Sequence, residues 1–170
     1  MSLKVIAFDL FGTVFDASGV DLEERRAYIR HVRKHQLEWR PLVLPQSWRT
    51  IPAHPDSAEG LRMLRDAGFQ VVTLTNWPRE QIEAASANAG IEWDRMILLE
   101  NYRCYKPTLG AYGAVAEEMG CETAETLMVT ANPGSGDDTK PLLIGMQTQV
   151  IRHGTPNTII ELAEMLRATA

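Results

Sequence analysis

The hydrophobic pattern of the chain begins with an apolar run that ends abruptly in an acid. The stretch VIAFDLFGTVFD occupies residues 5–16, and residues 5–8 lack the polar alternation of a half-exposed strand. Such a run is typical of a β-strand buried on both faces of a parallel sheet. Asp9 would lie at the edge of that sheet, where open α/β folds bind ligands. Gly12 permits a tight turn, and the Thr13 hydroxyl could hold one carboxylate oxygen of Asp9 while the other faces a substrate.

Two segments without a strand pattern follow. Residues 21–38 predict a charged surface helix, because basic residues separate apolar positions at helical spacings. Those apolar positions are Leu22, Ala27, Tyr28, Val32 and Leu37. Residues 41–55 contain four prolines, which exclude a continuous helix, so we expect a linker there.

From residue 56 onward, helices alternate with short apolar strands. Three helices end at Gly68, Gly90 and Gly120, Pro78 is placed as the N1 residue of the second, and a final helix begins at Pro156. The strands after the opening run are predicted at residues 69–75, 96–99, 127–130 and 148–151. The alternation predicts one α/β domain spanning residues 1–170, a Rossmann-like three-layer sandwich with a mainly parallel five-stranded sheet.

Composition narrows the functional classes. The 170 residues are 45% hydrophobic and 23% charged, with a formal net charge of -5, which argues against a nucleic-acid-binding surface. No apolar run reaches the roughly 20 residues of a membrane span, and no charged leader precedes the first strand, so we expect a cytoplasmic protein. Cys104 and Cys121 show neither a CxxC spacing nor a nearby His pair, so neither a disulfide framework nor a zinc site is indicated.

Polar side chains follow four of the predicted strands. In a parallel sheet these positions lie along one edge, so their side chains could converge on one pocket. The positions are Asp9, Thr75, Asn76, Lys106, Thr130, Asn132, Asp137 and Asp138. Each has an ordinary structural role as an alternative, but their joint placement favours nucleophilic attack by a carboxylate, giving an ester or acyl phosphate that water then cleaves. The charge of Lys106 would keep Asp9 ionised.

Ordered motifs give the chain a resemblance to the haloacid dehalogenase superfamily, most closely to its 2-haloacid dehalogenase branch. FDLFGTVFD is similar to that branch's FDxYGTLFD, and TLTN at residues 73–76 resembles its strand ending in Ser-Asn. CYKP at residues 104–107 resembles the YKP signature, with Tyr112 six residues past its lysine. VRKHQLEW at residues 32–39 is similar to the WRxxQLEY helix, and TAN at residues 130–132 looks like the Ser-Ser-Asn turn.

The resemblance implies a role for each matching residue. Asp9 would attack the halogen-bearing carbon, displace halide toward Arg33 and form an ester on its own side chain, which water then cleaves. Asp137, or alternatively Asp138, would activate that water. The residues implied to position the water and the nucleophile are Thr13, Lys106, Tyr112, Thr130 and Asn132. Thr75 and Asn76 would hold the substrate carboxylate, and no cofactor would be required.

Phe11 discriminates between reaction types within the superfamily. Its phosphatases carry an Asp two places after the nucleophile, as the general acid for the leaving alkoxide, and a phenylalanine cannot donate that proton. Halide is a weak base and needs no acid. Phe11 therefore favours carbon–halogen displacement, with Phe11 itself in the substrate pocket.

Two departures from the family pattern are visible in the sequence. The helical cap expected over the pocket is reduced to residues 17–54, little more than one helix and a linker. Such a pocket would admit water, which weakens electrostatic interactions inside it. The turn at residues 132–137 is longer by about two residues than in the family and lacks an aromatic side chain there, which leaves the choice between Asp137 and Asp138 open.

Three alternatives follow from these departures. One is a Mg²⁺-dependent phosphatase with an open site, its metal held by Asp9, Asp137 and Asp138. Another is a binding or regulatory protein that keeps the fold without catalysis. The third concerns assembly: the linker residues Leu42, Val43, Leu44 and Trp48 would either contact a second subunit in a homodimer or cover the sheet edge of their own chain.

Overall fold

A parallel five-stranded sheet forms the centre of the fold in the computed structural model, which describes residues 2–154 and 157–169. The strand order is β3-β2-β1-β4-β5, and every pair is parallel. The strands are β1 (Val5–Phe8), β2 (Gln70–Thr75), β3 (Arg95–Leu98), β4 (Thr126–Thr130) and β5 (Gln147–Val150). The apolar run at the start of the chain is therefore the central strand, as its lack of polar alternation predicts.

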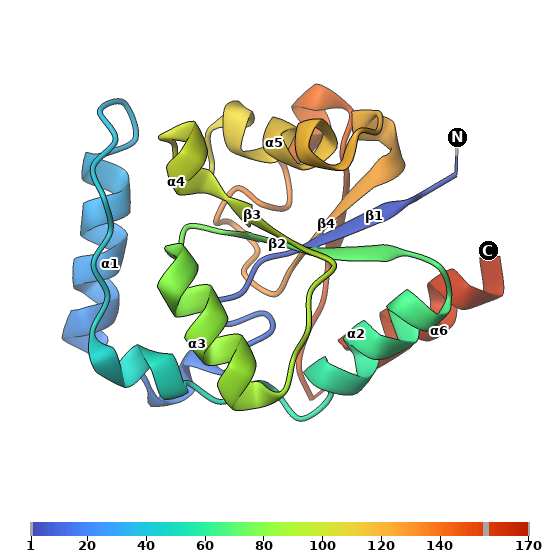
Figure 1. The fold of residues 1–170 in the computed structure, drawn as a ribbon, viewed down its shortest axis with the longest axis horizontal. Helices are drawn as coiled ribbons and strands as arrows, with labels where there is room; N and C mark the ends of the chain where they lie inside the picture. The colour runs from blue at the N-terminus through green and yellow to red at the C-terminus, as the bar shows by residue number, and fades with distance from the viewer. Residues whose placement is uncertain (1, 155–156, 170) are drawn as a thin grey trace.

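Helices cover both faces of this sheet, so the predicted three-layer arrangement is confirmed (Figure 1). One face packs against α2 (Ser57–Asp66), α3 (Arg79–Ala89) and α6 (Ile159–Thr169). The opposite face packs against α4 (Leu99–Tyr102) and α5 (Leu109–Met119).

Alternate side chains of β1 enter two separate hydrophobic cores. Ile6 and Phe8 belong to the core under α2, α3 and α6, whereas Val5 and Ala7 belong to the core under α5. All four side chains are fully buried. Because successive side chains of a strand point to opposite faces, this division fixes the register of β1 and hence the position of Asp9 at its carboxyl end.

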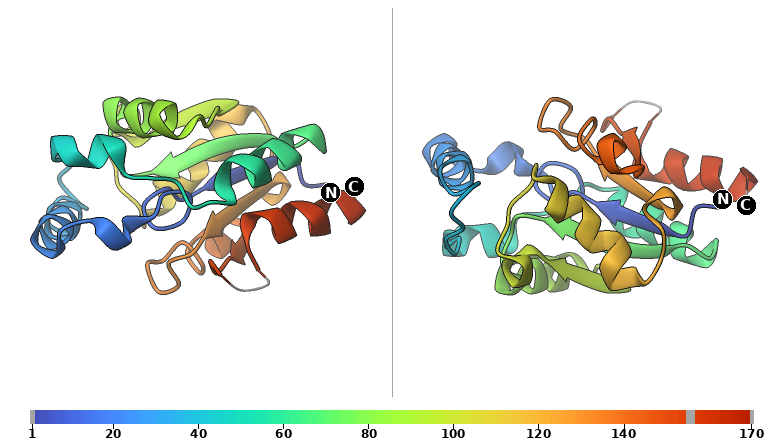
Figure 2. Two further views of the ribbon diagram at one scale, coloured as in Figure 1. Left: turned by 90° about the horizontal axis from the view of Figure 1, so that it is seen from below. Right: turned by 90° about the horizontal axis from the view of Figure 1, so that it is seen from above.

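Residues 17–54, here named the cap segment, lie outside the three layers. The segment contains the short 3-10 helices η1 (Ala17–Gly19) and η2 (Gln46–Thr50) and the helix α1 (Leu22–Lys34), which stands beyond one end of the sheet (Figures 1 and 2). Its two ends are joined: Phe15 forms an antiparallel bridge with Ala53, and the Asp16 amide donates to Pro52 O at 2.7 Å.

The helix α1 is shorter than predicted. Asp21 caps it by accepting the Glu23 and Glu24 amides, but the helix ends at Lys34 instead of residue 38, and His35 already leaves the helical conformation. Of the apolar positions noted in the sequence, Tyr28 and Val32 face the cavity, whereas Leu22 and Leu37 are exposed. The side of α1 that faces the core is occupied by other residues, described with the site below.

The proline-rich linker contains a turn of helix and covers its own chain. Trp48, in η2, is only 1% exposed, and Leu42 is also buried. Leu44 is partly buried, and of these four apolar residues only Val43 is largely exposed. Leu42, Leu44 and Trp48 thus pack within their own chain, against the cap helix and the ring of Phe11 and not against a sheet edge. A contact with a second subunit stays a prediction.

Smaller boundary differences have local causes. The short helix α4 was not predicted, because four residues are too few for a periodic pattern. Pro78 is the N-cap of α3 instead of its N1 residue. The last helix begins at Ile159, and the predicted start at Pro156 lies outside the described residues. Within residues 2–154 and 157–169, no helix is both long and apolar enough to cross a membrane.

Candidate active site

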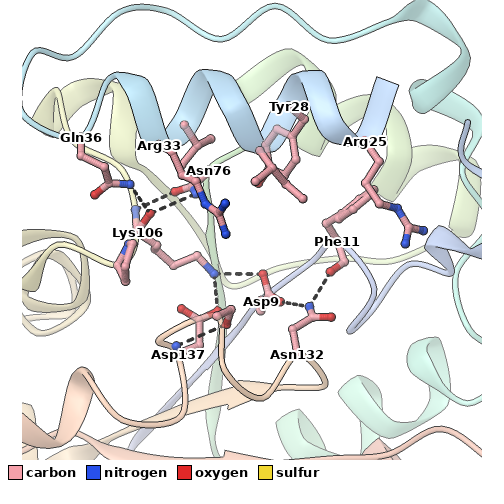
Figure 3. A pocket seen from close by; sticks show the side chains of 14 residues that line it. Asp9, Phe11, Arg25, Tyr28, Arg33, Gln36, Asn76, Lys106, Asn132 and Asp137 are labelled. Carbon is pink, nitrogen blue, oxygen red and sulfur yellow. Dashed lines mark hydrogen bonds and ion pairs between the residues drawn. The ribbon is translucent and has the colours of Figure 1, made fainter. Parts of the chain in front are cut away.

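A cavity of about 390 Å³ lies between the carboxyl edge of the sheet and α1 (Figure 3). The sheet edge supplies its floor, and successive turns of α1 supply the opposite wall. The pocket is therefore partly roofed, in contrast to the open pocket expected from the short cap segment. The lining residues are Asp9, Phe11, Arg25, Tyr28, Ile29, Val32, Arg33, Gln36, Asn76, Lys106, Pro107, Asn132, Ser135 and Asp137.

The two carboxylate oxygens of Asp9 have different surroundings. Oδ2 accepts hydrogen bonds from Thr13 Oγ1 at 2.9 Å, Asn132 Nδ2 at 2.7 Å and Thr130 Oγ1 at 3.4 Å. Oδ1 accepts from Lys106 Nζ at 2.9 Å. Three donors thus fix one oxygen, while the other accepts a single hydrogen bond among the described residues and retains lone-pair capacity toward the cavity. The predicted hydrogen bond from Thr13 to one oxygen of Asp9 is present, and the other oxygen faces the cavity.

Gly12 allows the backbone to turn directly after Asp9. Its φ is 81°, in the left-handed region that favours glycine, and a Cβ there would lie 3.1 Å from Asn132 Oδ1. The same Asn132 amide donates to Phe11 O at 2.8 Å, so the turn and the amide hold each other in place. Thr13 is tied to the neighbouring strand end as well, because its Oγ1 accepts the Ala131 amide.

Lys106 joins the two acids of the site. Its Nζ lies 2.9 Å from Asp9 Oδ1 and 2.7 Å from Asp137 Oδ2, and all three side chains are buried. Burial acts to lower the pKa of Lys106, but the two carboxylates outweigh it and raise that pKa above its ordinary value. The lysine is therefore a cation at neutral pH. Its charge compensates Asp9 and Asp137 together.

Asp137, and not Asp138, is the second acid of the cavity. The Tyr112 hydroxyl donates to Asp137 Oδ1 at 2.6 Å. Burial raises the pKa of the Asp137 carboxyl above 3.8, although Lys106 opposes the rise. Burial together with the Asp137 charge also raises the pKa of Tyr112. Asp138 lies outside the cavity lining, with its carboxylate near the Gly134 amide at 3.4 Å.

This donor arrangement does not fit the magnesium alternative. A magnesium site would need the carboxylates of Asp9, Asp137 and Asp138 around one point. Asp138 instead lies near the Gly134 amide, and the Lys106 ammonium contacts both of the other carboxylates. In the described part of the chain, no group of three or more His, Cys, Asp or Glu side chains is placed to hold a metal ion. The Lys106 ammonium already supplies to these two acids the positive charge that a divalent cation would supply.

Asn76 and Gln36 fix the backbone of the lysine. Asn76 Oδ1 accepts the Lys106 amide at 2.7 Å, and Gln36 Nε2 donates to Lys106 O at 3.0 Å. Gln36 lies just beyond the last residue of α1, so this bond connects the cap segment directly to the active-site lysine. Thr75 has a different role, because its Oγ1 accepts the Trp77 amide in the turn after β2.

An aromatic wall closes the end of the cavity around Phe11. The Phe11 ring stacks on Trp48 with centroids 4.9 Å apart and planes 4° apart, and it meets Tyr28 at 5.6 Å. The Arg25 guanidinium lies 5.5 Å from the Phe11 ring centroid. The wall missing from the turn at residues 132–137 is thus replaced by aromatic side chains from the cap segment.

The structure brings most of the predicted site residues to one cavity and places the others behind it. Those that line it are Asp9, Phe11, Arg33, Asn76, Lys106, Asn132 and Asp137. Those outside the lining are Thr13, Thr75, Tyr112 and Thr130, all buried, of which Thr13, Tyr112 and Thr130 hydrogen-bond the two acids. Thr75, which the resemblance implies as a ligand of the substrate carboxylate, thus does not line the cavity, whereas Tyr112 and Thr130 contact the two acids from behind.

Arg33 is the one cap-helix residue of the cavity, among those described, that the sequence predicts as part of the site. Arg25, Tyr28, Val32 and Gln36 recur at intervals of three or four, which places them on one side of the segment that includes α1. That spacing is visible in the sequence. It is obscured because the stripe is partly charged, whereas a buried helix face is normally identified by apolar residues.

The comparisons with known proteins agree with this geometry. No family model matches the chain. It is 27% identical to an (S)-2-haloacid dehalogenase of Xanthobacter autotrophicus over 174 aligned positions, covering 76% of this chain and 68% of that protein. It is 22% identical to haloacetate dehalogenase H-2 of a Moraxella species over 175 positions, covering 77% of this chain and 78% of that protein.

Solved structures show the same fold. The L-2-haloacid dehalogenase PA0810 superposes with a TM-score of 0.81 at 18% identity, covering 98% of this chain and 100% of that one. The L-2-haloacid dehalogenase of Xanthobacter autotrophicus with chloropropionic acid covalently bound superposes with a TM-score of 0.69 at 24% identity, covering 98% and 88%.

Fold and site together define an α/β protein with the haloacid dehalogenase fold. The resemblance of the sequence to the 2-haloacid dehalogenases is confirmed by the curated relatives, and the prediction of a hydrolase of this type is supported. The cap is small, as the sequence predicts.

Proposed function

We propose that the protein releases halide from a 2-haloacid, with Asp9 as the nucleophile. The observation that carries this proposal is the asymmetric Asp9 carboxylate, in which three donors hold Oδ2 and Lys106 alone holds Oδ1. Oδ1 attacks C2 of the substrate, the carbon–halogen bond breaks, and the halide leaves with the bonding electron pair. The product of this step is an ester on Asp9.

Phe11 supports halide as the leaving group. An alkoxide leaving group needs a proton donor nearby, but Phe11 is packed between Trp48 and Tyr28 and has no proton to give. The remaining acid of the cavity, Asp137, is held by Lys106 and Tyr112. A halide leaves without protonation, so the first step needs no proton donor at the position of Phe11.

Hydrolysis of the ester would use Asp137. A water attacks the Cγ carbon of the Asp9 ester, and Asp137 accepts a proton from that water. As the bond between Cγ and the ester oxygen breaks, Asp137 passes this proton to the departing oxygen, and the carboxyl group formed on Asp9 releases the second proton of the water to solvent. A 2-hydroxy acid leaves, and Asp9 is regenerated with an oxygen atom from water. Once Oδ1 is the ester oxygen, Oδ2 is the carbonyl oxygen, and Thr13 and Asn132, which already donate to Oδ2, would stabilise the charge that develops on it.

Arg33 and Asn76 would bind the substrate carboxylate and the departing halide. Arg33 reaches into the cavity from α1 (Figure 3) and has no carboxylate partner among the described residues, so it is available for the departing halide or the substrate carboxylate. Asn76 lines the same cavity, with its Nδ2 3.4 Å from Lys106 O. A small shift of that amide would let it contact a substrate carboxylate.

The direct test is halide release from the two enantiomers of 2-chloropropionate, measured by ion chromatography. Asp9→Asn should abolish release. Asp138→Asn should retain it, because Asp138 lies outside the cavity. In heavy-isotope water, multiple turnovers should place the isotope in Asp9, detected by mass spectrometry of the peptide. Absence of halide from these and several other 2-haloacids would overturn the proposal.

The alternatives have distinct outcomes in the same experiments. Mg²⁺-dependent hydrolysis of p-nitrophenyl phosphate, without halide release, would indicate the phosphatase. No turnover of either substrate class, and no isotope in Asp9, would indicate a binding protein.

A further inference from the structure

A second arginine of the cavity, Arg25, has no role in the reaction steps above. It lies on α1 at the opposite end of the cavity-facing stripe from Arg33, over the ring of Phe11 (Figure 3). We propose that Arg25 binds a second anionic group of the substrate, so that the preferred substrate is a 2-halodicarboxylate or a similar dianion. The identity of the reacting carbon rests on the proposed function, but the binding of a dianion does not.

The hydrogen bonding of Arg25 is incomplete. Its Nη2 donates to Ala17 O, which anchors one edge of the guanidinium. Its Nε is buried and has no hydrogen-bond partner among the described residues. A buried donor without an acceptor is costly, and most are satisfied in native proteins. Because protein atoms cover Nε, a ligand acceptor would reach it only after the Arg25 side chain turned toward the cavity.

The charge of Arg25 is also uncompensated by a carboxylate in the described chain. The adjacent Arg26 pairs with Glu23 at 2.5 Å on the outer side of α1. Glu24 does not serve Arg25, because its Oε2 accepts Trp48 Nε1 at 2.9 Å. The two acids of the cavity are both engaged by Lys106. An anionic ligand group would therefore be the natural partner of this half-buried guanidinium.

The spacing along α1 suits a substrate with two charged ends. Arg25 and Arg33 are eight residues apart in the sequence, which separates their Cα atoms by about 12 Å along the helix axis. Between them, Ile29, Val32 and the ring of Tyr28 line the cavity with apolar surface. This order, a cation, an apolar stretch and a second cation, complements a carbon chain with an anionic group at each end.

Matched pairs of substrates test the inference. In each pair the carbon number is equal and only the second carboxylate differs: 2-chlorobutanoate with 2-chlorosuccinate, and 2-chlorohexanoate with 2-chloroadipate. We expect kcat/KM for at least one diacid to exceed that of its monoacid by roughly tenfold or more, the usual effect of a charge-assisted hydrogen bond. Equal values in both pairs would overturn the inference.

Variants of Arg25 assign the preference to this residue. Arg25→Met keeps the apolar stem and should abolish the preference through KM, while the monoacid value changes by no more than about threefold. Arg25→Lys should keep part of the preference, because it keeps the charge. Arg30→Met, an exposed neighbour on α1 outside the cavity, is the control and should leave the preference intact. Equal losses on both substrates in Arg25→Met would indicate a merely structural role and overturn the inference.

A binding measurement separates this inference from the proposed function. Calorimetric titration with adipate and hexanoate, which carry no halogen, should show tighter binding of adipate to the wild type and no difference in Arg25→Met. If no haloacid is turned over but adipate binding depends on Arg25, the dehalogenase proposal fails and the dianion site remains. If halide is released but adipate and hexanoate bind equally, the dianion site is refuted and the dehalogenase remains.

Discussion

Lys106 Nζ lies 2.9 Å from Asp9 Oδ1, and the same ammonium group lies 2.7 Å from Asp137. One cation therefore serves the proposed nucleophile and the proposed base at once. Because the two acids act in successive steps, any change at Lys106 affects both of them.

Replacing Lys106 with methionine should reduce halide release by roughly 100-fold or more, since the variant loses preorganised charge at the reacting atoms. It also leaves two neighbouring carboxylates without their cation, so one of them should bind a proton at neutral pH. Steady-state halide release is the measurement. Lys34→Met, an exposed lysine at the end of α1, is the control and should behave as the wild type. Comparable losses in both variants would contradict this role.

The Tyr112 hydroxyl should set the acid limb of the pH–rate profile for ester hydrolysis. Asp137 must be ionised to accept a proton, so the rate falls as pH drops through its pKa, which burial raises above 3.8. Tyr112 donates to the ionised carboxylate and opposes that rise. Tyr112→Phe should therefore raise the pKa of Asp137 further and move the acid limb upward by roughly one pH unit.

Single-turnover hydrolysis of the trapped ester across pH measures this limb. Tyr102→Phe is the matched control, because Tyr102 donates to Glu118 and does not line the cavity. A limb that stays in place or moves to lower pH in Tyr112→Phe would refute the assignment of Asp137 as the base.

Gly12→Ala should impair activity beyond its effect on stability. The variant places a Cβ 3.1 Å from Asn132 Oδ1 in a backbone with φ of 81°, so both the turn and the amide that holds Asp9 must move. Gly120→Ala shares the positive φ, at 62°, but has open space around it. Both should unfold more readily by about 1 kcal/mol or more in urea. Only Gly12→Ala should lose halide release per folded molecule.

Trp48→Ala should cost about 3–5 kcal/mol of the free energy of unfolding, because it empties a large buried site. Trp48 stacks on Phe11, donates to Glu24 and accepts Gln81 Nε2 through its carbonyl oxygen. Leu37→Ala, at a fully exposed leucine, should change stability by no more than about 0.5 kcal/mol. Urea unfolding followed by circular dichroism compares the two, and similar costs would contradict the buried role of Trp48.

The residues at the carboxyl edge of the sheet are well predicted from the sequence, because the patterns that identify them lie within short stretches of chain. The apolar run before Asp9 identifies the central strand, and Gly12 and Thr13 identify the turn that exposes the acid. Lys106 is far from Asp9 in the sequence, yet its position was predictable, since the carboxyl ends of parallel strands share one edge. These signals needed no knowledge of side-chain packing.

The inward side of the cap segment was harder to predict, because it faces a cavity and not an apolar core. Periodicity identifies a helix face that meets an apolar core, whereas the inward side of α1 carries Arg25 and Gln36 beside Tyr28 and Val32. Trp48 lies in a proline-rich stretch with no period, so its burial depends on tertiary contacts alone. The choice between Asp137 and Asp138 likewise required the folded turn.

The bridge between Phe15 and Ala53 brings the two ends of the cap segment together at the rim of the core. Chain inserted between them can lengthen or shorten without moving the strands, because the entry and exit points stay adjacent. The core domain thus holds Asp9, Asp137 and Lys106 in place, whereas the cap segment supplies the wall of the cavity that a substrate must pass. We expect that a longer helical insert between Phe15 and Ala53 would change which substrates bind, while the position of Asp9 stays the same.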